Sequence, residues 1–187
     1  MPPDTLVAVT VRDATEADLP QITAIWNHEV LWTDATTDTE PRDPGAQREW
    51  FARHPAGYPI VVAVTAAEVL AFGALAPYRP KPAFARTVED SVYVKRGHRG
   101  AGLGDLILAE LIRRARAHGH HSMLARITSA NTASLRRAPR LRGRRRRVGG
   151  RLEARPLARC YDRAVSPVTL AFPRTGERSL PSPRRKG

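Results

Sequence analysis

The most constraining feature of the sequence is a glycine-rich turn between an extended apolar run and a strongly helical one. Residues 87–95 have the pattern of a strand, and the turn that follows contains Gly97, Gly100, Gly102 and Gly104, with Arg99 among them. The next segment has apolar residues at helical spacing, namely Leu103, Leu106, Ile107, Leu111 and Ala115. Glycines ahead of a helix let backbone N–H groups point outward beside the positive end of the helix dipole. The turn is therefore predicted to bind phosphate.

The spacing of the turn excludes two common phosphate-binding motifs. A dinucleotide fingerprint, G-x-G-x-x-G, fails because Asp105 stands at the third glycine position after Gly100 and Gly102. A P-loop fails because no Gly-Lys-Ser/Thr ends the turn. The pattern that fits is Arg-x-x-Gly-x-Gly, at Arg99, Gly102 and Gly104. An ordinary strand-to-helix turn is the alternative, and a motif this short does not decide between the two.

The net charge of +13 is carried by one part of the chain. Residues 1–134 contain 14 Lys and Arg against 15 Asp and Glu, whereas residues 135–187 contain 17 against 3. An Arg-rich tail can bind a nucleic-acid backbone, but the near-neutral body and the lack of aromatic residues among the arginines argue against that partner. We expect a domain at 1–134, followed by an Arg- and Pro-rich tail at 135–187 that is disordered or results from a frameshift.

Size and composition favour a single domain in the cytoplasm. Of the 187 residues, 42% are hydrophobic, which is within the globular range. Cys160 is the only cysteine, which fits a reducing compartment. The chain has no signal-peptide pattern and no apolar run of the roughly 20 residues that a membrane helix needs, so we expect no membrane contact. His118, His120 and His121 lack a nearby carboxylate or thiol, so we expect surface residues and no metal site.

The order of the expected elements is that of an α/β sandwich around a mixed sheet. Hydrophobic patterning predicts strands at about 7–15, 58–65, 69–76, 87–95 and 122–128, and helices at about 19–31, 45–53 and 105–119. The run at 58–65 is almost wholly apolar and therefore belongs in the centre of the sheet. Residues 69–76 follow it after a tight connection and are expected to form a hairpin with it.

Four segments, residues 29–41, 78–84, 87–94 and 129–134, resemble in sequence and order the phosphinothricin/methionine sulfoximine N-acetyltransferases of the GNAT superfamily. The resemblance runs from about residue 7 to residue 134. It implies the GNAT acyl-CoA N-acyltransferase fold, a mixed central sheet with helices on both faces. It also implies an enzyme that moves an acetyl group from acetyl-CoA to the amine of a small amino-acid analogue, often as a homodimer. The turn would then be the pyrophosphate loop for acetyl-CoA.

The resemblance also implies roles for individual residues. Glu89 matches the family's catalytic base, with a solvated strand glutamate as the alternative, and it shares a strand face with Ser91 and Tyr93. The expected acetyl-CoA contacts are Val92, Tyr93, Val94, Arg99, Gly100, Ala101, Gly102, Leu103, Gly104, Asp105 and Asn131. Either the Val92 or the Tyr93 N–H would polarise the thioester carbonyl, and Asn131 could equally cap the next helix. The expected substrate contacts are Arg79, Lys81, Phe84 and Thr87, with Arg79 holding the substrate carboxylate.

The sequence departs from the family in two places. Thr37 stands where the family usually has an aromatic residue, which bears on the preference for substrate side chains. Beyond residue 134 the family continues with a helix and two strands, whereas Pro139 would break such a helix here. We expect the loss of these elements to leave a sheet edge open. An inactive remnant is therefore an alternative to an active enzyme.

Overall fold

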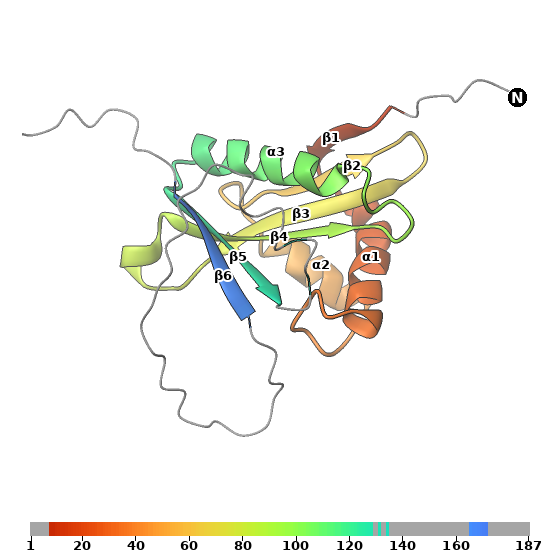
Figure 1. The fold of residues 1–187 in the computed structure, drawn as a ribbon, viewed down its shortest axis with the longest axis horizontal. Helices are drawn as coiled ribbons and strands as arrows, with labels where there is room; N and C mark the ends of the chain where they lie inside the picture. The colour runs from red at the N-terminus through yellow and green to blue at the C-terminus, as the bar shows by residue number, and fades with distance from the viewer. Residues whose placement is uncertain (1–7, 129–130, 132–133, 135–164, 172–187) are drawn as a thin grey trace, which may run out of the picture.

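The protein folds as one mixed sheet with helices on both faces (Figure 1). The computed structural model describes residues 8–128, 131, 134 and 165–171. The strands are β1 (Thr10–Asp13), β2 (Ile60–Val64), β3 (Val69–Pro77), β4 (Thr87–Val94), β5 (Ser122–Thr128) and β6 (Val165–Ala171). The helices are α1 (Leu19–Trp32), α2 (Pro44–Ala52) and α3 (Leu103–Ala117), with short 3-10 turns at Glu16–Asp18 and Pro82–Phe84. The predicted fold class is confirmed.

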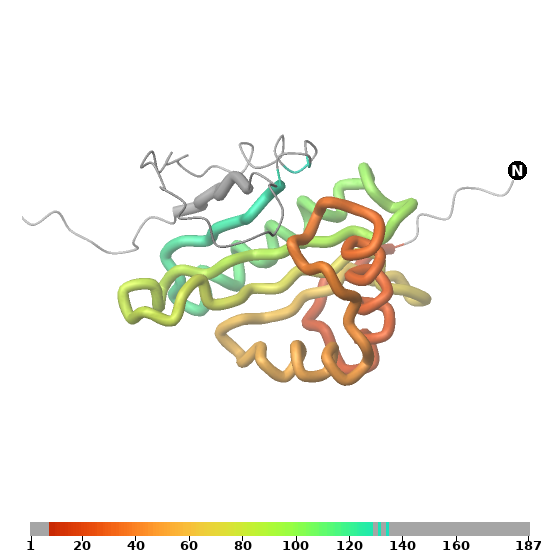
Figure 2. The backbone as a smooth tube through the Cα atoms, turned by 90° about the horizontal axis from the view of Figure 1, so that it is seen from below, coloured from red at the N-terminus to blue at the C-terminus, as the bar shows by residue number. Residues whose placement is uncertain are grey.

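The strands lie in sequence order across the sheet, and only β4 and β5 are parallel. Their register covers four pairs, from Thr87 opposite Ser122 to Asp90 opposite Ala125. Beyond these pairs β5 diverges from β4 (Figures 1 and 2). A parallel neighbour requires a crossover connection, which α3 supplies.

The edge of the sheet at β5 is not open, contrary to the sequence-based expectation. β6 pairs antiparallel with β5 along its whole length, from Ser122 opposite Ala171 to Thr128 opposite Val165. The segment 165–171 is rich in Val, Thr and Leu, which favour a strand. The rest of the tail lies outside the described residues, and so does the expected helix break at Pro139. The domain boundary at residue 134 therefore stays a prediction.

Two apolar layers hold the helices to the sheet. On one face α3 packs on β2 and β3 through Ile107, Leu111, Val61 and Leu75. On the other face α1 packs through Ile22 and Trp26 against Val62 and Phe72, with α2 beside it. β2 is buried on both faces, as its continuous apolar run predicted. These layers fix the position of β4, which carries the candidate catalytic residue.

The buried stripe of α3 is narrower than expected. Leu103, Ile107, Leu111 and Ala115 are buried at strict four-residue spacing, whereas Leu106 is 42% exposed. At about 100° per residue, Leu106 lies on the flank of the helix away from that stripe. The expectation that Leu106 faces the core is therefore wrong.

The histidine cluster also differs from expectation at one position. His118 is exposed, but His120 is buried, with its Nε2 2.8 Å from the Gly57 carbonyl oxygen and its ring 5.3 Å from that of Tyr58. In the described part of the chain, no three His, Cys, Asp or Glu side chains gather in a way that could hold a metal ion. None of the described helices has the length and apolarity needed to cross a membrane.

Gly73 on β3 is the point where α3 comes closest to the sheet. A Cβ at this position would lie 2.5 Å from Ile107 Cγ2, 2.9 Å from Leu111 Cδ1 and 3.0 Å from the Ser91 carbonyl oxygen. Glycine is therefore required by packing rather than by backbone conformation. The absent side chain lets α3 lie directly on the strand.

Replacing Gly73 by alanine is expected to lower the free energy of unfolding by about 1–3 kcal/mol, because the added methyl group overpacks the interface between α3 and β3. Urea unfolding followed by circular dichroism measures the change. Gly57→Ala is the matched control, since nothing lies within 4 Å of a Cβ there. Equal stability of the Gly73→Ala variant and the parent would contradict the close approach.

Candidate active site at the gap between β4 and β5

The candidate site begins where β4 and β5 separate. After the pair Asp90–Ala125, the register between the two strands stops, while Ser91 to Val94 continue to pair with β3. Alternate residues of a strand direct their N–H and C=O groups to the same side. The backbone groups on the other side of β4 therefore face the gap, where a ligand can pair with them as a further strand would.

The hydrogen bonds of β4 identify which residues face the gap. The Thr87 carbonyl oxygen accepts from Tyr78 N–H at 3.3 Å, and Lys95 N–H donates to the Leu70 carbonyl at 2.8 Å. Odd-numbered residues therefore direct their backbone groups toward β3, and the even-numbered Val92 and Val94 direct theirs toward the gap. The sequence left the Val92 and Tyr93 amides as alternatives, and this geometry favours Val92.

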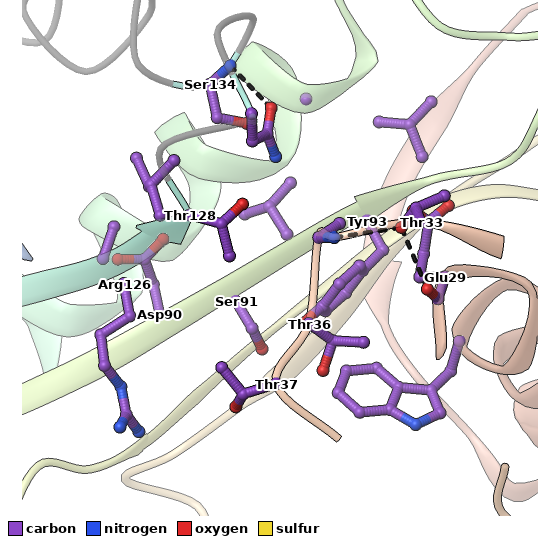
Figure 3. A pocket seen from close by; sticks show the side chains of 18 of the residues that line it. Glu29, Thr33, Thr36, Thr37, Asp90, Ser91, Tyr93, Arg126, Thr128 and Ser134 are labelled. Atoms are coloured by element: carbon purple, nitrogen blue, oxygen red, sulfur yellow. Dashed lines mark hydrogen bonds between the residues drawn. The ribbon is translucent and has the colours of Figure 1, made fainter. Parts of the chain in front are cut away.

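A cavity of about 590 Å³ opens at this gap. Its walls come from the end of α1, the loop after it, β4, the start of α3 and the end of β5, and Figure 3 shows part of the lining. Among the predicted site residues, those that line it are Glu89, Val92, Tyr93, Val94, Arg99, Gly104, Asp105 and Asn131. Gly100, Ala101, Gly102 and Leu103 belong to the adjoining turn and the first residue of α3.

The glycine turn has the conformation that its sequence suggested. Gly97, Gly100 and Gly102 have φ values of +87°, +87° and +81°, which favour glycine, and nothing lies within 4 Å of a Cβ at any of them. α3 begins directly after Gly102, with no side chain capping its N-terminus. The turn thus offers open space beside the positive end of a helix, which fits a phosphate group.

Arg99 is anchored by a carboxylate that the sequence analysis did not identify. Its guanidinium donates to Glu29, which is only 3% exposed and also accepts from Thr33 Oγ1 at 2.8 Å. Glu29 lies near the C-terminus of α1, where the helix dipole disfavours a negative charge, so Arg99 supplies needed compensation. A signal was present in the sequence, because Glu29 falls three residues after Trp26 on the apolar stripe of α1.

Glu89 points to the α1 and α2 side of the sheet, as expected from its strand position. Its Oε1 accepts from Arg126 Nε at 2.5 Å. The Glu89 side chain is 19% exposed and that of Arg126 is 63% exposed, so the pair lies at the rim of the cavity. Arg126 follows the last β4–β5 pair on β5, and the sequence analysis did not identify it.

An aromatic cluster forms the floor of the cavity. The Tyr93 ring stacks on Phe72 at 5.2 Å and meets the edge of Trp26 at 4.9 Å, and burial raises the pKa of its phenol. The Arg42 guanidinium lies 4.0 Å from the centre of the Trp26 ring and 5.0 Å from that of Trp50, and burial lowers its pKa.

The predicted contact of Asn131 is present in the structure, whereas the four predicted substrate contacts lie outside the cavity. Asn131 Oδ1 accepts from Ser134 N–H at 3.1 Å, which is the predicted capping contact, and both residues line the cavity. Arg79, Lys81, Phe84 and Thr87 do not line it: Arg79 lies over the Phe84 ring at 5.9 Å, and Thr87 begins β4 at the end away from the gap. Their substrate roles stay predictions.

Asp90 is a buried carboxyl group at the last β4–β5 pair. It is 9% exposed, and desolvation, with a smaller contribution from the charge of Glu89, raises its pKa to about 7. In the unfolded chain this carboxyl group has its ordinary pKa of 3.8. Between about pH 4 and pH 7 the folded protein therefore binds a proton at Asp90 that the unfolded chain has released. The free energy of unfolding falls as the pH rises from about 4 to 7.

Asp90→Asn is expected to raise the free energy of unfolding at pH 8 by on the order of 2–4 kcal/mol and to leave it nearly unchanged at pH 4. The neutral amide avoids the cost of a buried charge. Chemical unfolding at the two pH values measures this. A variant that is no more stable than the parent at pH 8 would contradict the pKa shift.

Asp18→Asn is the control, because the pKa of Asp18 is lowered in the folded protein whereas that of Asp90 is raised. Asp18 accepts from Arg12 at 2.7 and 2.9 Å and from Thr15 N–H, and these bonds lower its pKa to about 2. Its stabilising effect is present above about pH 4 and is lost as the pH falls toward 2, so the asparagine variant should be less stable than the parent at pH 8.

Comparison with known proteins identifies the family to which this site belongs. The sequence model of the Acetyltransferase (GNAT) family matches residues 23–143. The chain belongs to the GNAT acetyltransferase family. It is 47% identical over 131 residues to the L-methionine sulfoximine/L-methionine sulfone acetyltransferase of Pseudomonas paraeruginosa, covering 69% of this chain and 76% of that protein.

Two further relatives of this GNAT acetyltransferase are phosphinothricin acetyltransferases. The phosphinothricin N-acetyltransferase of Streptomyces coelicolor is 39% identical over 132 residues, which is 68% of this chain and 77% of that protein. A phosphinothricin acetyltransferase from Sinorhizobium meliloti, solved in complex with acetyl-CoA, superposes with a TM-score of 0.70 at 33% identity, covering 74% of this chain and 76% of that one.

Proposed function

We propose that this enzyme transfers the acetyl group of acetyl-CoA to the primary amine of a small amino-acid analogue of the phosphinothricin or methionine sulfoximine type. One observation carries the proposal: a single cavity joins the glycine turn, the gap-facing side of β4 and the carboxylate of Glu89. The printed activities of the relatives from Pseudomonas paraeruginosa and Streptomyces coelicolor support it.

The residues of the gap fit acetyl-CoA, which supplies an acetyl thioester when bound. The turn from Arg99 to Asp105 would hold the pyrophosphate through backbone N–H groups at the start of α3. The Val92 N–H, directed to the gap, would donate to the thioester carbonyl oxygen and stabilise the negative charge that develops there. Val94 and Asn131 would hold the pantetheine arm, and the Asn131 amide group keeps a donor besides its capping contact.

Glu89 is the proposed base for the amine. The amine must lose a proton to attack, and Glu89 is a carboxylate in the cavity with an oxygen not bonded to Arg126. The ammonium gives one proton to Glu89, and the neutral amine attacks the thioester carbonyl carbon. The new N–C bond forms as the C–S bond breaks, and the second proton leaves the nitrogen for the departing CoA thiolate, which gives the N-acetyl product and the CoA thiol. Ser91 and Thr37 line the same cavity, which suits a substrate with polar side-chain oxygens.

Glu89→Gln is expected to lower kcat by about 10²- to 10⁴-fold and to leave acetyl-CoA affinity unchanged, because the amide cannot accept the proton. Thiol release with methionine sulfoximine and phosphinothricin measures turnover, and calorimetry measures acetyl-CoA binding. Glu49→Gln is the matched control, since the Glu49 side chain is 76% exposed on α2.

Unchanged turnover of Glu89→Gln would remove Glu89 from the mechanism. Acetyl-CoA binding without turnover of any amine by the parent chain would instead support the inactive remnant considered from the sequence. The two outcomes are distinct, because the first requires an active parent.

A further inference from the structure

Three guanidinium groups line the described cavity, those of Arg42, Arg99 and Arg126. Arg99 is held by the buried carboxylate of Glu29. Arg42 lies between the rings of Trp26 and Trp50, with 18% of its side chain exposed and Asp38 at 3.4 Å. Within the described residues, Arg42 Nη1 is buried without a hydrogen-bond partner, but neither Arg42 nor Arg99 is bonded to Glu89.

Arg126 differs from the other two because its carboxylate partner is Glu89, the proposed base. Its side chain is 63% exposed and lies at the rim of the cavity, to one side of the other side chains labelled in Figure 3. Within the described residues, its only side-chain partner is Glu89, bonded through Nε. A guanidinium that donates one Nε–H retains both terminal nitrogens, which can bind a carboxylate through two parallel hydrogen bonds.

We propose that Arg126 binds the α-carboxylate of the amino-acid substrate while Glu89 receives the proton of its amine. This inference rests on the proposed function and assigns the substrate class of the same site. In an α-amino acid, the amine and the carboxylate are attached to one carbon. Arg126 and Glu89 are also neighbours, because one hydrogen bond joins them. The substrate carboxylate can therefore lie against Arg126 while the substrate amine lies against Glu89.

The position of Arg126 beside Glu89 also explains how a negatively charged substrate group could enter a site that contains a carboxylate. A substrate carboxylate that enters beside Glu89 would be repelled by it, and Arg126, which is paired with Glu89, is a cation that would offset this repulsion. Arg79, which the sequence analysis assigned to this task, does not line the cavity and instead lies 5.1 Å from the centre of the Tyr78 ring. Arg126 therefore selects substrates with a free carboxylate next to the amine.

The test compares two substrates that differ only in that carboxylate. Methionine sulfone carries it, and 3-(methylsulfonyl)propylamine lacks it. Arg126→Gln should raise the KM for methionine sulfone by roughly 10- to 100-fold, as expected for a lost hydrogen bond to a charged group. The same variant should lose far less kcat/KM for the amine without the carboxylate, because that substrate senses only the effect of Arg126 on Glu89, and it should keep the parent's KM for acetyl-CoA.

Two further variants sharpen the comparison. Arg126→Lys keeps the charge but loses the two-point geometry, so its KM for methionine sulfone should lie between those of the parent and Arg126→Gln. Arg79→Gln is the matched control for the sequence-based alternative and should change neither substrate's KM. Unfolding curves of all variants establish that the fold is retained.

Two kinetic results would overturn the inference. An equal loss on both substrates would mean that Arg126 acts only through Glu89. A loss with Arg79→Gln and none with Arg126→Gln would assign the carboxylate to Arg79.

Calorimetric binding of methionine sulfone in the presence of CoA separates this inference from the proposed function, because it needs no turnover. Binding that weakens in Arg126→Gln supports the inference even if the parent is inactive. Equal binding by both proteins, or no binding by the parent, contradicts it.

Discussion

The separation of two parallel strands is the constraint on which the site depends. β4 and β5 pair over four residues and then diverge, which leaves the gap-facing amides of Val92 and Val94 without a strand partner on that side. Unpaired backbone groups inside a protein cost free energy unless a ligand or water satisfies them. The fold can keep them at little cost because the gap is open to a cavity. In the proposed function, acetyl-CoA would take the place of a missing strand.

The sequence predicted the elements well where local pattern and burial agree. The apolar run of β2, the hairpin with β3 and the glycines of the turn each depend on local backbone preference or two-sided burial, and all are confirmed. Leu106 and His120 were misassigned because spacing alone does not give the width of a contact surface. β6 was missed because the sequence analysis treated residues 135–187 as one Arg-rich tail and did not separate the short apolar segment at 165–171 from it.

The site was predicted less completely, because its decisive contacts join residues far apart in the chain. Glu29 meets Arg99 across 70 positions, and Glu89 meets Arg126 across 37. Each of these pairs sets a carboxylate against an arginine, whereas at Asp90 burial, together with the charge of Glu89, outweighs a backbone hydrogen bond and raises the pKa to about 7. Glu29 and Glu89 are thus each paired with an arginine, whereas Asp90, which lines the same cavity, is not. Composition and spacing contain no information about that difference.

β6 has a consequence for substrate recognition that its position at the sheet edge does not suggest. Arg126, Ile127 and Thr128 lie beyond the pairing with β4, so their backbone is aligned in the sheet only by β6, with Pro167 opposite Arg126. The 36 residues between β5 and β6 make this a non-local pairing with an entropic cost of closure. The proposed carboxylate contact of Arg126 therefore depends on the stability of β6, which is distant in sequence, and a substitution in β6 would alter that contact without changing a residue of the cavity.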